Sequence, residues 1–78
     1  MRTRERLIFV IESLNEPVVG SWTYHAFASA ARHLREGEVF NPVTLSNMRH
    51  IAAHDPRDHM RSLASSALAH NDEMEALL

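Results

Sequence analysis

The stretch that most constrains the fold of this chain is residues 24–42, YHAFASAARHLREGEVFNP. It joins an alanine-rich segment to a glycine at Gly37, a short apolar run and an exit through Asn41 and Pro42. Glycine is favoured just past the end of a helix, and proline cannot donate to a β-ladder, so the stretch predicts a helix followed by a short strand over 38–41. It holds no nucleophile beside a base, and it therefore constrains the fold more than the activity.

The predicted helix covers residues 22–35 and has one apolar face. Ser21 precedes it, and Arg32 and Arg35 lie in its last turns, where cations interact favourably with the helix dipole. Most side chains on the apolar face are small, so the helix can pack closely against a neighbouring element. The face follows the three- and four-residue spacing of a helix: Trp22, Ala26, Phe27, Ala30, Ala31 and Leu34.

The remaining strands are predicted at the two ends of the chain. Residues 7–11, LIFVI, form a continuous apolar run rich in β-branched residues, which is typical of a central parallel strand buried on both faces. Residues 12–20 contain asparagine, proline and glycine and are expected to form a loop beside a ligand crevice. Residues 73–78 suit an edge strand or the continuation of a helix, and both readings stay open.

The second half of the chain also predicts two helices. The first covers residues 45–53, with Thr44 as its cap. Asp55, followed by a proline, is typical of an N-cap and predicts the start of the second helix, which Asn71 or Asp72 ends. The apolar stripe of this second helix is Met60, Leu63, Ala64, Ala67 and Leu68.

The order of these elements predicts a single α/β domain over residues 1–78. Strands separated by helices call for right-handed crossovers and a parallel sheet. We expect a small three-stranded sheet of order 2-1-3 with about three helices, a Rossmann-like or flavodoxin-like half-domain. Both edges of such a sheet are open, which favours association between copies of the chain.

Composition narrows the classes of function. The chain has 78 residues, no cysteine and a formal net charge of −2. Because a chain of this length buries only roughly 60 to 65% of its unfolded surface, we expect a homo-oligomer to add stability. The charge argues against a nucleic-acid partner, and no apolar run reaches the roughly 18 residues of a membrane span. We therefore expect a cytoplasmic protein that needs no cofactor and contacts neither nucleic acid nor membrane.

Several segments together resemble a known family. They are IFVIESL, YHAFASAARHLREGEVFNPVTL and RDHMRSLASSALAHNDEMEALL, with Phe40, Asn41, Pro42, Arg57, Met60, Arg61 and Asp72 as anchors. The chain is similar in these segments to small phage and prophage proteins that share the nucleoside 2-deoxyribosyltransferase-like fold. The resemblance covers most of the chain, and it implies an α/β scaffold and a viral protein that acts in the host cytoplasm.

Two departures from that family argue against its catalysis. The family has glycine and proline after its first strand, whereas this chain has ESLN at residues 12–15. The family's carboxylate nucleophile follows the last matched strand, beyond Leu78. The resemblance therefore implies a scaffold that has lost its catalytic end.

A ligand crevice is predicted at the carboxyl ends of the strands, where Glu12, Ser13, Asn41 and Asp72 would meet. Glu12 is the one candidate for a catalytic base or nucleophile, but no partner acid accompanies it. The simpler alternative is an exposed or ion-paired glutamate. We therefore expect no catalytic residue, with Glu12 as the weak exception.

Histidines and aromatic residues supply two further candidates. His50 and His54 lie four residues apart, on one helix face, but the glutamate of an HExxH zinc motif is absent, so exposed polar positions are the expected alternative to a metal site. The aromatic residues at the start of the first long helix are more often core or interface than a ligand box. The predicted protein-contact surface is Val18, Val19, Trp22 and Tyr24.

Two functions remain in view. The first is a non-enzymatic interaction protein, phage-encoded, that binds itself and a host protein. The second is a nucleoside- or nucleotide-binding protein, or an enzyme acting on N-glycosidic bonds that an oligomer completes.

Overall fold

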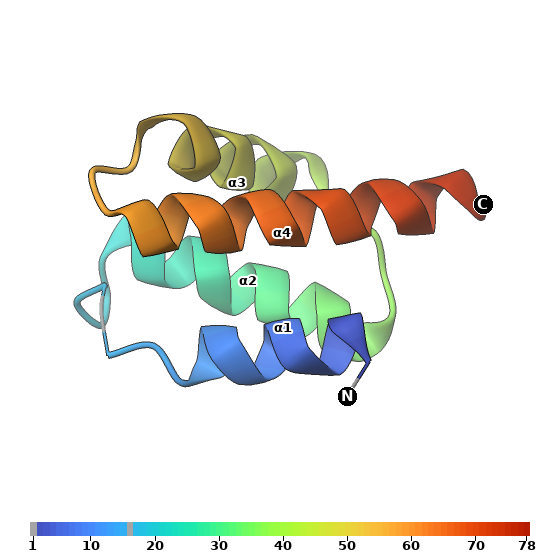
Figure 1. Cartoon of the computed structure of the whole chain (residues 1–78), viewed down its shortest axis with the longest axis horizontal. Helices are drawn as coiled ribbons and strands as arrows, with labels where there is room; N and C mark the ends of the chain where they lie inside the picture. Colours follow the sequence, from blue (N-terminus) through green and yellow to red (C-terminus); the bar gives the residue numbers. More distant parts are fainter. Residues whose placement is uncertain (1, 16) are drawn as a thin grey trace.

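Four α-helices form the regular structure of the chain in a computed structural model that describes residues 2–15 and 17–78. In chain order they are α1 (Thr3–Glu12), α2 (Trp22–Glu36), α3 (Pro42–His54) and α4 (Asp58–Ala76). Successive helices run in opposite directions, and α1 returns to contact α4, which closes an up-and-down bundle (Figure 1). The longest helix, α4, extends past its neighbours at its carboxyl end, on the side of the molecule where α1 begins (Figure 1).

The predicted α/β fold is therefore wrong. No strand occurs among the described residues, so the three-stranded parallel sheet of order 2-1-3, the Rossmann-like or flavodoxin-like half-domain and the nucleoside deoxyribosyltransferase-like scaffold are all replaced by a helical bundle. The expectation of a homo-oligomer loses the support of open sheet edges at the same time. That expectation now depends on which residues the surface of the helical bundle exposes.

The apolar run at residues 7–11 forms the second half of α1 and not a strand. Leu7 and Ile11, four residues apart, are both buried, whereas Phe9 between them is 62% exposed. A strand would have placed all three on one face, because its side chains alternate with a period of two. Five consecutive apolar residues fit either period, so the run itself could not distinguish a buried strand from a helix.

The second predicted strand, residues 38–41, is the connection between α2 and α3. Phe40 is buried there, and its backbone N–H donates to Oδ1 of Asn71 at 2.7 Å. Nδ2 of Asn71 donates in turn to Oε1 of Glu75 at 3.1 Å. A side chain of α4 thus satisfies the backbone donor that a β-ladder would otherwise have satisfied, and it fixes the connection to the bundle.

The prediction for α2 is confirmed to within one residue at its carboxyl end. Ser21 caps α2, and Gly37 follows it with a φ of 70°, the left-handed conformation that glycine adopts without steric cost. The start of α3 was predicted too late, because Asn41 caps it and Pro42 is its first residue. Proline fits that position since the first N–H groups of a helix have no partner within it.

The boundary between α3 and α4 also differs from the prediction. Asp55 ends α3 and does not cap α4, which begins at Asp58. Asn71 and Asp72 lie inside α4, and the helix continues through Ala76. Of the two alternatives for residues 73–78, the helical one is therefore correct through Ala76, and the last two residues follow the helix.

The core lies between all four helices, and α2 and α4 supply most of it. Its largest fully buried apolar side chains are Phe27 and Leu34 on α2, Met48 and Ile51 on α3, and Met60 on α4. Within the described ranges, no helix has the length and the apolar character needed to cross a lipid bilayer. The residues left at the surface of the bundle are those that can contact other molecules.

Candidate interaction surface

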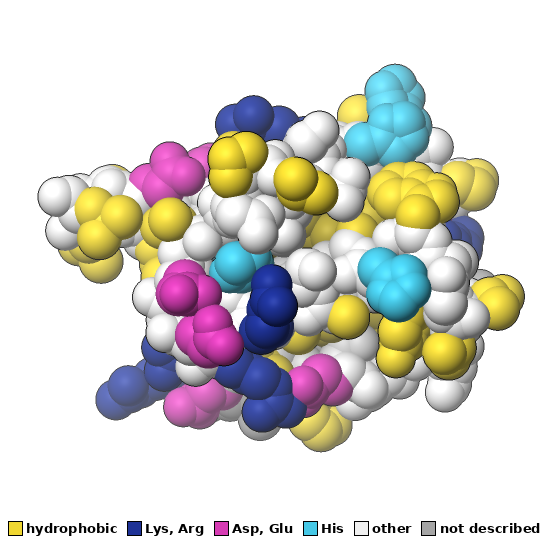
Figure 2. Space-filling model, turned by 180° about the vertical axis from the view of Figure 1, so that it is seen from behind, with side chains coloured by type: hydrophobic (Ala, Val, Ile, Leu, Met, Phe, Trp, Pro, Cys, Tyr) yellow, Lys and Arg dark blue, Asp and Glu magenta, His cyan; other side chains and the backbone are white. Residues whose placement is uncertain are grey.

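A group of large apolar side chains lies exposed where α1 connects to α2. We call it the loop surface, and it consists of Val18, Val19, Trp22 and Tyr24, the four residues predicted as a contact surface. Their exposed fractions are 79%, 77%, 53% and 37%. Figure 2 shows hydrophobic side chains gathered at the end of the molecule that carries this connection. The structure thus exposes all four, with Trp22 beside α3 and Tyr24 beside the end of α1, and their role in an interface stays a prediction.

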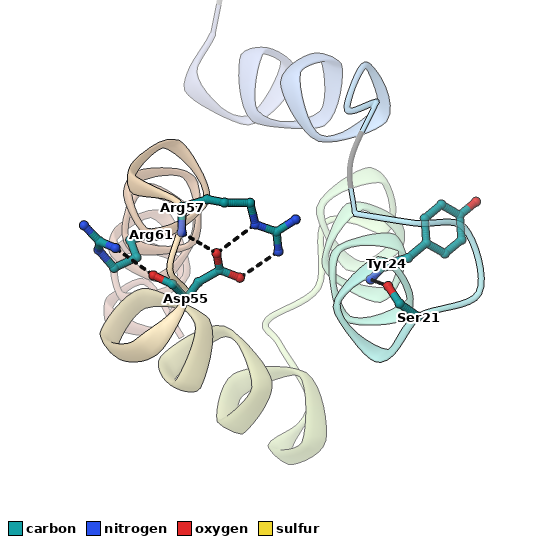
Figure 3. Close-up of polar contacts among 5 residues, drawn as sticks. All are labelled: Ser21, Tyr24, Asp55, Arg57 and Arg61. Carbon is teal, nitrogen blue, oxygen red and sulfur yellow. Dashed lines mark hydrogen bonds and ion pairs between the residues drawn. The ribbon is translucent and has the colours of Figure 1, made fainter.

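Local sequence fixes the shape of the loop surface. Gly20 has a φ of 90°, which residues with a side chain rarely adopt, so it allows the chain to turn into α2. Ser21 then caps the helix, because its Oγ accepts a hydrogen bond from the backbone N–H of Tyr24 at 3.2 Å. Figure 3 shows this bond and the ring of Tyr24 pointing away from the bundle. The turn and the cap together hold Trp22 and Tyr24 on a rigid helix start.

An apolar groove of about 430 Å³ adjoins the loop surface. It follows α2 from Tyr24 to Arg35, a distance of about 16 Å at 1.5 Å per residue. Small and apolar side chains of α2 line it along one side, and the end of α1 with the following loop lines the other. The apolar lining residues are Ile11, Leu14, Pro17, Phe27, Ala28 and Ala31.

An ion pair lies at the arginine end of the groove. Nε and Nη2 of Arg35 donate to the carboxylate of Glu12, the Nε bond measuring 2.7 Å. The two side chains are 58% and 42% exposed, so solvent screens their attraction. Glu12, the weak catalytic candidate, is therefore half of a surface ion pair that joins α1 to α2. Arg32 lines the groove beside it.

The four residues of the predicted ligand crevice are not brought together. Glu12 and Ser13 lie at the end of α1, whereas Asn41 caps α3. The Oγ of Ser13 donates to the carbonyl oxygen of Phe9 at 2.7 Å, and Oδ1 of Asn41 accepts from the N–H of Thr44 at 2.8 Å. Asp72 is exposed on α4. Each of the first three has a structural contact of its own, and of the four residues only Glu12 lines the groove.

Sequence reasoning missed a polar cluster in the turn between α3 and α4. The buried carboxylate of Asp55 accepts hydrogen bonds from the backbone N–H, Nε and Nη2 of Arg57, each at 2.9 Å. Nη1 of Arg61 donates to the carbonyl oxygen of Asp55 at 2.7 Å (Figure 3). The side-chain hydrogen bonds from Arg57 hold the pKa of Asp55 below its usual value. The cluster fixes the angle of the turn, and the only sequence signal for it was the DPRD run at residues 55–58.

His50 and His54 stand together on the exposed side of α3. Their ring centroids are 5.0 Å apart, and the ring of Trp22 meets His50 edge-on with centroids 5.5 Å apart. No cluster of three or more side chains with metal-binding groups was found among the described residues. Within the described residues, the pair therefore offers two ligands and no third.

Comparison with known proteins gives no relative from which a function could be transferred. No family model matches the chain, and no curated protein or solved structure matches it.

Proposed function

We propose that this chain is a non-enzymatic interaction protein that binds a second copy of itself through the loop surface and the adjoining groove. The observation that carries the proposal is an exposed apolar projection, Val18 and Val19, beside an apolar groove that begins at Tyr24 and follows α2. A two-fold axis between two copies can place each projection in the groove of the other. Such an arrangement is self-complementary and buries both features at once.

The size of the molecule supports the use of both features together. A stable interface buries about 800 Å² on each partner, which is about a sixth of the 5003 Å² surface of this chain. Four side chains cannot supply that area alone, so the groove must take part. Trp22 and Tyr24 are the residue types that contribute most to binding at such interfaces.

A second candidate is the binding of a nucleotide in the same groove. Tyr24 and Arg32 both line it, so a base could stack on the ring while a phosphate contacts the guanidinium. This alternative requires no second copy of the chain. It predicts a rise in melting temperature with added nucleotides, whereas self-association predicts a melting temperature that rises with protein concentration.

Sedimentation equilibrium over a range of protein concentrations tests the first proposal. We expect a monomer–dimer equilibrium for the natural chain and a monomer for the double variant Val18→Asp, Val19→Asp, because buried carboxylates in the interface would lack partners. Val43→Asp is the matched control, since Val43 is 69% exposed on α3 and lies outside the groove. It should associate as the natural chain does.

A natural chain that stays monomeric at millimolar concentration would overturn self-association. A clear thermal shift with nucleotides in that monomer would favour the second candidate. A monomer without such a shift would leave a different protein as the partner for the loop surface.

A further inference from the structure

The histidine pair on α3 has the geometry of a chelating metal site. His50 and His54 are one helical turn apart, so their side chains project from the same face. Both residues are exposed, and neither ring makes a hydrogen bond to another described residue. Their ring nitrogens therefore have lone pairs available to an ion from solvent.

The spacing of the two rings matches what one ion requires. For Zn–N bonds of about 2.0 to 2.1 Å, two imidazoles bound to the same ion at angles between about 90° and 109° have ring centroids about 4.5 to 5.2 Å apart. The observed separation is 5.0 Å, with 47° between the ring planes. The separation of the two rings is therefore compatible with both of them binding one ion.

The chemistry of the ligands selects the class of ion. Imidazole nitrogen suits Zn²⁺, Ni²⁺ and Cu²⁺, whereas Mg²⁺ and Ca²⁺ prefer oxygen ligands. No third metal-binding side chain was found beside the pair in the described part of the chain, so water or a group from another molecule would complete the coordination. We propose that His50 and His54 form an open two-histidine site for a divalent transition-metal ion.

The protein contains its own reporter for this site. Trp22 is the only tryptophan of the chain, and its ring lies 5.5 Å from that of His50. An open-shell ion such as Ni²⁺ bound to the pair would quench the fluorescence of this indole at close range. Zn²⁺ has a filled d shell and lacks this open-shell quenching, so an excess of Zn²⁺ that competes for the pair should restore the fluorescence.

The decisive experiment titrates Ni²⁺ into the natural chain and into His54→Ala while tryptophan fluorescence is recorded. His54→Ala removes one ligand and leaves the contact between Trp22 and His50 in place. Because the second imidazole binds within the same molecule, its loss should weaken Ni²⁺ binding by about tenfold or more. His25→Ala is the matched control, an exposed histidine beside Tyr24, and should bind within about twofold of the natural chain.

Zn²⁺ competition measured by calorimetry, which does not depend on fluorescence, should give the same ranking of the three proteins. Circular dichroism establishes that the variants remain folded, as expected for an exposed position at the end of α3. Equal Ni²⁺ affinity in the natural chain and His54→Ala would overturn the proposal. So would an equal loss in His25→Ala, because binding would then be spread over the surface histidines.

Discussion

The two halves of this bundle are held together in different ways. Helices α3 and α4 make the most extensive contact of any helix pair, across a turn of three residues that the hydrogen bonds of Asp55 fix. Helices α1 and α2 are joined by a longer connection, and the polar link between them is the exposed ion pair of Glu12 and Arg35. Only Leu7 and Ile11 are buried on α1.

The difference suggests a division of roles, in which the α3–α4 half is the scaffold of the fold and the α1–α2 half carries the candidate interaction surface. The α3–α4 half is stabilised by buried apolar contacts and buried hydrogen bonds, and its exposed large apolar side chains are Val43 and the two leucines after α4. The α1–α2 half contains the loop surface, the groove and the exposed ring of Phe9. Segments with few buried contacts open at low free energy, and binding regions are commonly drawn from them. The proposed interaction surface accordingly adjoins α1, which has the fewest buried residues of the four helices.

The largest expected effect is the loss of a core side chain from α4. Met60 is fully buried, so Met60→Ala should lower the free energy of unfolding by about 2 to 5 kcal/mol through lost burial and a residual cavity. Leu7→Ala on α1 should cost an amount near the lower end of that range, because α1 can shift to close the space. Urea denaturation of both variants measures the difference. A larger loss for Leu7→Ala would contradict the division into scaffold and surface.

A smaller effect is expected at the turn of the α3–α4 half. Asp55→Asn removes the charge that Arg57 binds and should lower the free energy of unfolding by about 1 to 3 kcal/mol at neutral pH. Because Arg57 lowers the pKa of Asp55 in the folded state, this stabilisation is complete above the unfolded pKa of about 3.9 and is lost as the pH falls through the folded value.

Denaturation at a series of pH values checks this prediction. The difference in stability between the natural chain and Asp55→Asn should be largest near neutral pH and should shrink at strongly acidic pH. Asp72→Asn is the control, because Asp72 is exposed on α4 and should show little difference at any pH. A difference between the natural chain and Asp55→Asn that does not depend on pH would show that the carboxylate charge is not responsible.

The smallest effect is expected at the ion pair of the α1–α2 half. Glu12→Gln should lower the free energy of unfolding by about 0 to 1 kcal/mol, because both partners are largely exposed and screened by solvent. Added salt should reduce even this difference. Chemical denaturation at low and high ionic strength makes the comparison. A loss as large as that of Asp55→Asn would show that the two halves are held equally firmly.

The sequence predicted α2 from its start and stop signals, misplaced the starts of α3 and α4, and failed where a short run fits two periods. Ser21, the alanine face and Gly37 gave α2 correctly, because capping and helical spacing are local properties. Residues 7–11 and 38–41 were assigned to strands because apolar content alone does not separate a buried strand from a buried helix or a packed connection. The sequence predicted a contact surface at Val18, Val19 and Trp22, but only the tertiary structure shows that these side chains are exposed.

The sequence by itself determined the helix ends at Ser21 and Gly37, the pairing of His50 with His54 on one helix face, and a charge and length that limit the functions open to the chain. The helix ends and the histidine pair each depend on residues within a turn or two of one another, whereas charge and length are sums over the chain. Tertiary structure decided that residues 7–11 form a helix, that Asn71 binds the backbone of Phe40, and that Glu12 meets Arg35. Those outcomes depend on which elements pack together, and no local preference contains that information.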